Sequence, residues 1–109
     1  MADDGSDFEF LSPASFEWDD QKRELNLAKH GIDFDSAIEV FYGPIILRGS
    51  DRNNEERWTA LGYSGDRLVV VVFIRRADVI RIISARRARK NEERDYRNAK
   101  MGRPPQGQD

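Results

Sequence analysis

The sequence has no cysteine and only one histidine among its 109 residues. Without thiols the chain can form neither disulfides nor zinc–cysteine sites, and such a composition suits the cytoplasm, where we expect the protein to act. A single imidazole excludes a pair of histidines working as acid and base, and it excludes a metal site with two histidine ligands. We expect no metal and no cofactor.

Long apolar runs and several active-site motifs are also missing. No apolar stretch approaches the ~20 residues that a membrane helix needs, and the start, Met-Ala-Asp-Asp, is acidic where a secretory signal would be basic. There is no Walker-type phosphate loop and no serine-hydrolase nucleophile turn. Glu17, Asp19 and Asp20 lie close in sequence, but nothing else supports a magnesium site. The chain should therefore be neither membrane-bound nor exported.

The charge that is present is unevenly distributed. The net charge is −2, but residues 1–47 contain 3 basic and 11 acidic side chains, whereas residues 75–103 contain 11 basic and 4 acidic ones, a net charge of +7. A local field of this strength attracts polyanions whatever the total charge. The basic segment therefore predicts contact with nucleic acid, although arginine-rich helices are often only solvated surfaces.

The apolar pattern predicts one α+β domain over residues 15–99. Residues 1–14 should form a disordered acidic extension and residues 100–109 a disordered tail, because neither has usable periodicity. After a short strand at 16–18, two helices should start and end at polar or glycine positions: Asp19 or Asp20, Gly31, Asp33 and Gly43-Pro44.

The period then changes from helical to extended. We expect an antiparallel meander on which the two N-terminal helices pack, with residues 68–74 as a central strand covered on both faces. A polar connection is expected over residues 49–55, and a last helix from about Arg87 to Asn98. The predicted strands and turns are strands at 45–47, 58–63, 68–74 and 79–85, with turns at 64–66 and 77–78.

Arginines gather where the last strand meets the last helix. Ile80 to Ala85 runs without glycine or proline into Arg86-Arg87-Ala88-Arg89-Lys90. Guanidinium groups held on rigid elements suit phosphate oxygens, and they stabilise charge that accumulates on phosphate. Arg75, Arg81 and Arg86 are therefore the first candidates for gripping a scissile phosphate in one shared cleft, and Arg89 and Lys90 would extend the track along an RNA backbone.

Strand alternation complicates this grouping. Arg81 and Arg86 should point to opposite faces of a regular strand unless a bulge or the start of the helix intervenes. One of them could instead be structural, paired with Glu55, Glu56 or Asp78, and Arg81 is as good a candidate for a buried ion pair as for a phosphate contact.

Other residues also have two interpretations. His30 is either a favourable cation at a helix C-terminus or a general base or acid near neutral pH. Tyr96 is either an anchor for the last helix or a stacking platform for a base. Arg57 is a surface charge unless it lines the same groove, and Trp18 and Trp58 are assigned to the core.

Two sets of residues together resemble the BrnT family of toxins, over roughly residues 16–97. The first set is Phe16-Glu17-Trp18-Asp19, Lys22, Asn26, Lys29-His30-Gly31, Phe34, Ala37 and Phe41. The second set is Glu56-Arg57, Gly62, Leu68-Val69-Val70-Val71, Arg81-Ile82-Ile83-Ser84-Ala85-Arg86, Glu93-Arg94 and Tyr96. The extension before residue 15 is longer than such toxins usually have.

The resemblance implies a RelE-like fold and a metal-independent ribonuclease that arrests translation. It also implies neutralisation by a BrnA-like ribbon-helix-helix antitoxin, with operator DNA bound only through that antitoxin. The residues that match this pattern best are His30, Arg57, Arg75, Arg81, Arg86 and Tyr96.

We therefore expect a type II endoribonuclease toxin. Its catalytic residues would be His30, as proton shuttle, with Arg75, Arg81 and Arg86. Its RNA-binding residues would be Arg57, Arg89, Lys90 and Tyr96. Two alternatives remain at this point: a basic nucleic-acid-binding module that cuts nothing, and a basic helix that docks an acidic protein.

Overall fold

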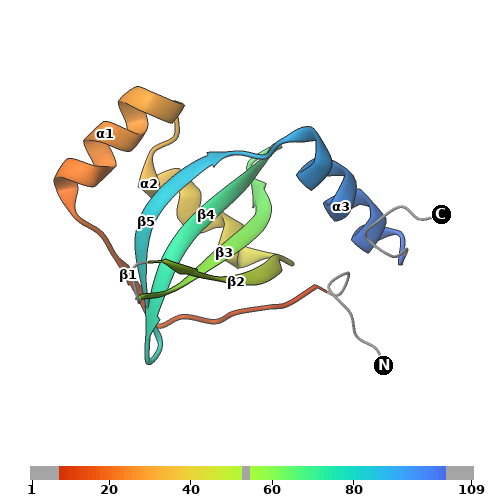
Figure 1. The fold of residues 1–109 in the computed structure, drawn as a ribbon, viewed down its shortest axis with the longest axis horizontal. Coiled ribbons are helices and arrows are strands. Elements are labelled where there is room, and N and C mark those ends of the chain that lie inside the picture. Colours follow the sequence, from red (N-terminus) through yellow and green to blue (C-terminus); the bar gives the residue numbers. More distant parts are fainter. Residues whose placement is uncertain (1–7, 53–54, 103–109) are drawn as a thin grey trace.

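The structure, a computed structural model, describes residues 8–52 and 55–102. The elements in chain order are β1 (Ser15–Glu17), α1 (Asp20–His30), α2 (Phe34–Ala37), the 3₁₀ helix η1 (Ile38–Tyr42), β2 (Ile46–Arg52), β3 (Glu55–Ser64), β4 (Arg67–Arg76), β5 (Val79–Arg87) and α3 (Lys90–Lys100). Figure 1 shows α1 and α3 toward opposite ends of the long axis, with the sheet between them. None of the described helices is long and apolar enough to cross a membrane.

The predicted α+β class is confirmed, and one strand adds to the expected topology. The sheet order is β1-β5-β4-β3-β2, and β2 to β5 form the expected antiparallel meander with β4 in the centre. The short strand β1 pairs with β5 in parallel, with Phe16 opposite Ile80. The sheet is therefore mixed. A parallel pair of strands needs a long connection, and the helices and the other strands of the meander provide it between β1 and β5.

Local capping residues set the helix ends as expected. The Asp19 carboxylate accepts a hydrogen bond from the Gln21 backbone N–H at 2.8 Å, so Asp19 caps α1. Gly31 ends α1 with φ at 71°, a left-handed conformation that glycine adopts without strain. Asp33 caps α2 by accepting from the Asp35 N–H at 3.2 Å.

Several boundaries differ from the prediction because strand pairing continues further than the apolar pattern does. β2 extends to Arg52, so most of the expected connection at 49–55 is strand. β5 extends to Arg87, which is paired with Val69, and α3 starts at Lys90 rather than near Arg87. Residues 8–14 of the expected extension run beside the folded domain, where Glu9 and Ile45 exchange backbone hydrogen bonds at 2.8 and 3.0 Å. The remainder of the extension and tail, residues 1–7 and 103–109, lies outside the described residues.

Two apolar clusters cover the two faces of the sheet. The larger lies between the sheet and the helices α1, α2 and η1, and its biggest members include Phe34, Phe73 and Ile82. Trp18 and Trp58 pack against it while partly buried. The smaller cluster lies under α3 and consists of Ile46, Leu61, Val70 and Tyr96, with Phe8, Leu68, Ala88 and Ala99 packed against it. Alternate β4 residues enter the two clusters, so α3 covers the face opposite the N-terminal helices.

Candidate functional site

A β-bulge in β5 decides which arginines share a face. Val72 pairs with Ser84 and Phe73 with Ile82, so Ile83 is the extra residue. Ile80 and Ile82 before the bulge, and Ala85 after it, all enter the larger core cluster. Arg81 and Arg86 therefore both point away from that cluster, toward the α3 side. The regular alternation expected from the sequence is wrong here. A bulge, which was named as the exception, places Arg81 and Arg86 on the same face.

Two more arginines lie on this side of the sheet. Trp58 and Ala60 of β3 belong to the larger core, so Arg57 and Thr59 alternate to the opposite face. Arg48 of β2 pairs with Thr59 and lies on that face as well. We call Arg48, Arg57, Arg81 and Arg86 the arginine face; the sheet presents them from three strands, β2, β3 and β5.

Acidic residues from neighbouring elements hold three of these arginines. Arg81 Nη1 lies 3.2 Å from Glu17 Oε2, directly across the β1–β5 pairing. The Arg86 guanidinium donates to both carboxylate oxygens of Glu92 at 2.9 Å, and Arg48 Nη2 lies 3.3 Å from Asp95 Oδ2 on α3. Arg81 and Arg86 thus pair with Glu17 and Glu92. Among the described side chains neither arginine pairs with Glu56 or Asp78, and the side chain of Glu55, the third acid expected, lies outside the described ones.

The Arg86–Glu92 pair is half-buried and preorganised. Its hydrogen bonds hold the pKa of the Glu92 carboxyl below its ordinary value and raise the pKa of Arg86. Glu92 also accepts the Arg89 backbone N–H at 2.8 Å, which closes the first turn of α3. Counting a further bond from Nη1 to the Arg87 carbonyl, Arg86 retains two of its five N–H donors for a phosphate oxygen. Arg86 can therefore stabilise an anion but cannot act as a base.

Arg75 does not join the arginine face. It lies two residues after Phe73 in β4, opposite Ile80, and so points to the side of the larger core. Its guanidinium carbon lies 5.6 Å from the ring centroid of Trp58, a cation–π contact. The expectation that Arg75 shares one cleft with Arg81 and Arg86 is wrong, because side chains alternate regularly along β4 up to Arg75.

His30 is the last residue of α1, next to the Gly31 cap, and it lies in the layer of the N-terminal helices. In the described part of the chain it makes no hydrogen bond or ion pair with a side chain of the arginine face. It lies one helical turn after Asn26, and Asn26 contacts β5 at Ala85, so both residues are on the face of α1 toward β5.

Tyr96, Arg89 and Lys90 come from α3. The Tyr96 side chain is 4% exposed, and its hydroxyl donates to the Pro44 carbonyl at 2.8 Å. Burial raises the pKa of Tyr96, so the phenol stays protonated and anchors the helix. Arg89 and Lys90 are exposed at the start of α3.

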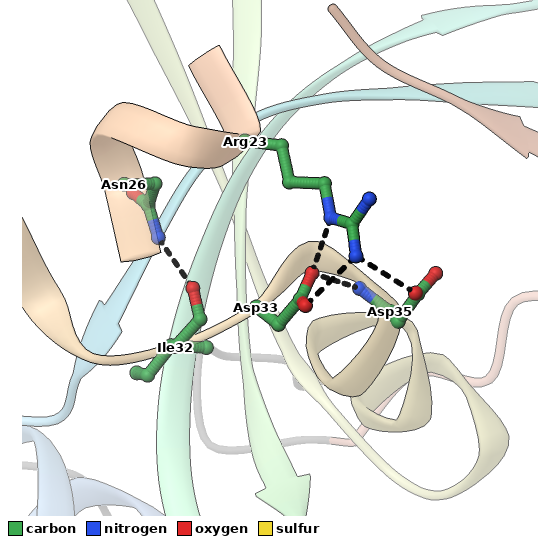
Figure 2. Close-up of polar contacts among 5 residues, drawn as sticks. All are labelled: Arg23, Asn26, Ile32, Asp33 and Asp35. Atoms are coloured by element: carbon green, nitrogen blue, oxygen red, sulfur yellow. Dashed lines mark hydrogen bonds and ion pairs between the residues drawn. The ribbon is translucent and has the colours of Figure 1, made fainter. Parts of the chain in front are cut away.

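Sequence reasoning missed the support behind Arg86. The side-chain amide of Asn26, buried in α1, donates to the Ala85 carbonyl at 2.9 Å and to the Ile32 carbonyl at 3.0 Å. Figure 2 shows the second of these bonds beside the Arg23–Asp33 ion pair, 2.7 Å, which ties α1 to the start of α2. The available signals were an asparagine on the inner side of an amphipathic helix and the place of Asn26 among the residues that resemble the BrnT family. Arg48 was missed as well, because its strand was predicted to end at residue 47.

No described group of three or more acidic or histidine side chains could hold a metal ion. The chemistry that the arginine face offers is stabilisation of negative charge by preorganised donors, which suits a phosphodiester whose charge increases during cleavage.

Comparison with known proteins agrees with this chemistry. Residues 18–92 match the model of a family described as the ribonuclease toxin BrnT of type II toxin–antitoxin systems. The fold is also similar to the crystal structure of the ribonuclease toxin BrnT from Brucella abortus, with a TM-score of 0.55 and 28% sequence identity. That alignment covers 70% of this chain and 97% of the Brucella chain. No curated protein matches the sequence significantly.

Proposed function

Because the chain belongs to the BrnT family of ribonuclease toxins of type II toxin–antitoxin systems, we propose that it cleaves RNA on the arginine face without a metal ion. Its partners are an RNA substrate and a cognate antitoxin. We assign the transition-state contacts to Arg81 and Arg86, with Arg48 and Arg57 beside them on the backbone of the RNA. Arg89 and Lys90, at the start of α3, extend this track.

The main support for the proposal is the bulge at Ile83. It turns Arg81 and Arg86 to the same face of β5, whereas regular alternation would separate them across the sheet. Both are held in place, Arg81 by Glu17 and Arg86 by Glu92, so neither needs to be ordered when RNA binds. A single well-aimed donor contributes about 3 kcal/mol to stabilising such a transition state.

Cleavage by the 2′-hydroxyl of the RNA also needs a base for that hydroxyl and an acid for the leaving oxygen. Arginine cannot supply the base near neutral pH. We assign proton transfer to His30, the only imidazole in the chain. His30 ends α1 one helical turn after Asn26, which contacts the edge of β5 at Ala85, the residue before Arg86. Metal-independent cleavage is supported by the preorganised guanidinium donors of the arginine face, which can themselves stabilise the charge that accumulates on the phosphate.

For the antitoxin, we propose a BrnA-like ribbon-helix-helix protein that covers the basic face and packs on α3, with the complex binding operator DNA through the antitoxin and the toxin acting in the cytoplasm. The support is the small buried face of α3, which contributes a single fully buried side chain, Tyr96, to the toxin's own core.

The test is cleavage of a labelled single-stranded RNA in excess EDTA. Wild-type protein should cut it, Arg81→Ala and Arg86→Ala should lose about 100-fold or more in rate, and His30→Gln should lose activity near neutral pH. Arg75→Ala, which removes a guanidinium from the opposite face, should cut at nearly the wild-type rate. Circular dichroism melting of each variant separates loss of chemistry from loss of fold.

Two results would contradict the proposal. One is full activity in both Arg81→Ala and Arg86→Ala. The other is activity that EDTA abolishes and magnesium restores.

A further inference from the structure

A groove of about 360 Å³ runs between α3 and the end of the sheet where β3 turns into β4. Its lining includes four cationic side chains: Arg67 of β4, Arg87 of β5, and Arg97 and Lys100 of α3. Tyr63 of β3 contributes an aromatic ring, and Asp66 and Glu93 contribute two carboxylates. We call this the hairpin groove. Neither the proposed cleavage chemistry nor the packing of the core accounts for its composition.

None of the cations of the hairpin groove has an acidic partner among the described residues. Within residues 8–52 and 55–102, none of Arg67, Arg87, Arg97 and Lys100 forms an ion pair, whereas Arg23, Arg48, Arg81 and Arg86 all do. Four cations and two carboxylates leave the lining with a net charge of +2. Like charges gathered around a concave surface favour an anion from solution.

Tyr63 supplies a fixed aromatic surface in this setting. Its side chain is 43% exposed, and its ring meets the Tyr96 ring edge-on, with centroids 5.3 Å apart and planes at 87°. Tyr96 is itself held by Pro44. An exposed ring backed by a buried, hydrogen-bonded one is a preorganised platform on which a nucleic-acid base can stack.

The hairpin groove is adjacent to the arginine face in two elements. Val70, which pairs with Arg86, lies on the same face of β4 as Leu68, which lines the groove two residues away. In α3, Glu92, which holds Arg86, lies one helical turn before Tyr96, which also lines the groove. An RNA strand that passes Arg86 therefore meets the groove next.

We propose, on the basis of the proposed ribonuclease function, that the hairpin groove binds a nucleotide of single-stranded RNA flanking the cleavage site. Its base stacks on Tyr63, and the neighbouring phosphates contact Arg67, Arg87, Arg97 and Lys100. The two carboxylates favour a nucleotide over an acidic peptide, because Asp66 and Glu93 can accept hydrogen bonds from base amino groups but would repel peptide carboxylates. The groove would then set affinity and sequence preference, and the arginine face the chemistry.

The test uses a fluorescent 12-nucleotide RNA of mixed sequence with 2′-O-methyl groups, which cannot be cut because the attacking hydroxyl is blocked. Fluorescence anisotropy at several salt concentrations gives Kd and its salt dependence. The triple variant R67Q/R97Q/K100Q should bind at least about tenfold more weakly, and the slope of log K against log salt should fall by about 2. Tyr63→Leu should weaken binding about fivefold or more and leave the salt slope unchanged.

A charge-matched control removes three cations from other surfaces, K22Q/K29Q/R75Q. If the groove triple variant binds RNA as tightly as this control does, the groove proposal is wrong. It is also wrong if the triple variant keeps its RNA affinity and loses only its binding to the purified cognate antitoxin, because the groove would then be a protein-docking site. Melting curves establish that each variant is folded.

The two proposals fail separately in this design. Cleavage of unmodified RNA by Arg81→Ala and Arg86→Ala at the wild-type rate would contradict the proposed chemistry, but it would not affect the test of the groove. Unchanged RNA affinity of the groove variants would contradict the groove proposal and leave the proposed cleavage chemistry standing. If both proposals hold, the groove triple variant should cut an unmodified 12-nucleotide RNA with a raised KM, whereas the K22Q/K29Q/R75Q control should keep the wild-type KM.

Discussion

The side-chain amide of Asn26 on α1 pairs with both backbone groups of Ala85 on β5, as a neighbouring strand would. Asn26 Nδ2 donates to the Ala85 carbonyl at 2.9 Å, and the Ala85 N–H donates to Asn26 Oδ1 at 3.1 Å. β1 pairs with β5 only from Val79 to Arg81, so this edge of β5 is otherwise without a strand partner at Ala85. The contact fixes the backbone immediately before Arg86.

Replacing Asn26 by alanine should therefore cost about 3 kcal/mol of unfolding free energy, because it leaves buried backbone groups of Ala85 and Ile32 without partners. Urea denaturation at neutral pH measures this. Asn91→Ala, which truncates an exposed asparagine on α3, is the matched control and should change stability by less than about 0.5 kcal/mol. Equal, small effects for the two variants would show that the pairing contributes nothing.

Gly62 is required by close packing. A Cβ there would lie 3.0 Å from Ile45 Cγ2, 3.1 Å from Val40 Cγ1 and 3.3 Å from the Pro44 carbonyl oxygen. Gly62→Ala should destabilise the fold by about 1–3 kcal/mol through overpacking. In Gly49→Ala the nearest atom, on Trp58, would be 3.8 Å away, so that variant should match or slightly exceed wild-type stability. Thermal unfolding of both variants is the measurement, and a neutral Gly62→Ala would contradict the packing argument.

The Arg86–Glu92 pair makes stability depend on pH. The pKa of Glu92 is lowered in the folded state, chiefly by its hydrogen bond with Arg86. A group whose pKa is lower in the folded than in the unfolded chain contributes stability above its unfolded value, and the contribution is lost as pH falls through the folded value. The advantage of wild type over Glu92→Gln should therefore be largest at about pH 7 and shrink below about pH 5.

Urea unfolding of wild type and Glu92→Gln at several pH values provides the comparison. Arg23 lowers the pKa of Asp33 in the same direction, but that pair is present in both proteins, so its effect cancels in the difference. Glu93→Gln, at the exposed neighbouring position, serves as the control. A difference between wild type and Glu92→Gln that stays constant with pH would contradict the assignment.

Much of the fold followed from short-range sequence signals. Asp19, Gly31 and Asp33 set helix ends through contacts within three or four residues, and those ends were predicted correctly. The turns at 64–66 and 77–78 and the central position of β4 were also predicted. The family resemblance drawn from residues 16–97 is confirmed by a match over residues 18–92.

Contacts between distant segments could not be predicted in the same way. The parallel pairing of β1 with β5 and the Glu17–Arg81 ion pair join residues 64 positions apart. The ends of β2 and β5 were misplaced because backbone pairing with a neighbouring strand, and not apolarity, determines how far each strand runs. The unpaired cations of the hairpin groove come from β4, β5 and α3, so no local pattern groups them.

The amino-acid order alone determined that arginines would be concentrated near the end of β5, that they would lie on rigid elements, and that no thiol or paired-imidazole chemistry was available. Tertiary structure decided which of them act together. The bulge at Ile83 arises from pairing with β4 and rotates Arg86 to the side of Arg81, whereas Arg75 stays with Trp58 on the other face. Side-chain direction in a strand has a fixed period of two, but an inserted residue reverses it, and only the partner strand determines whether one is present.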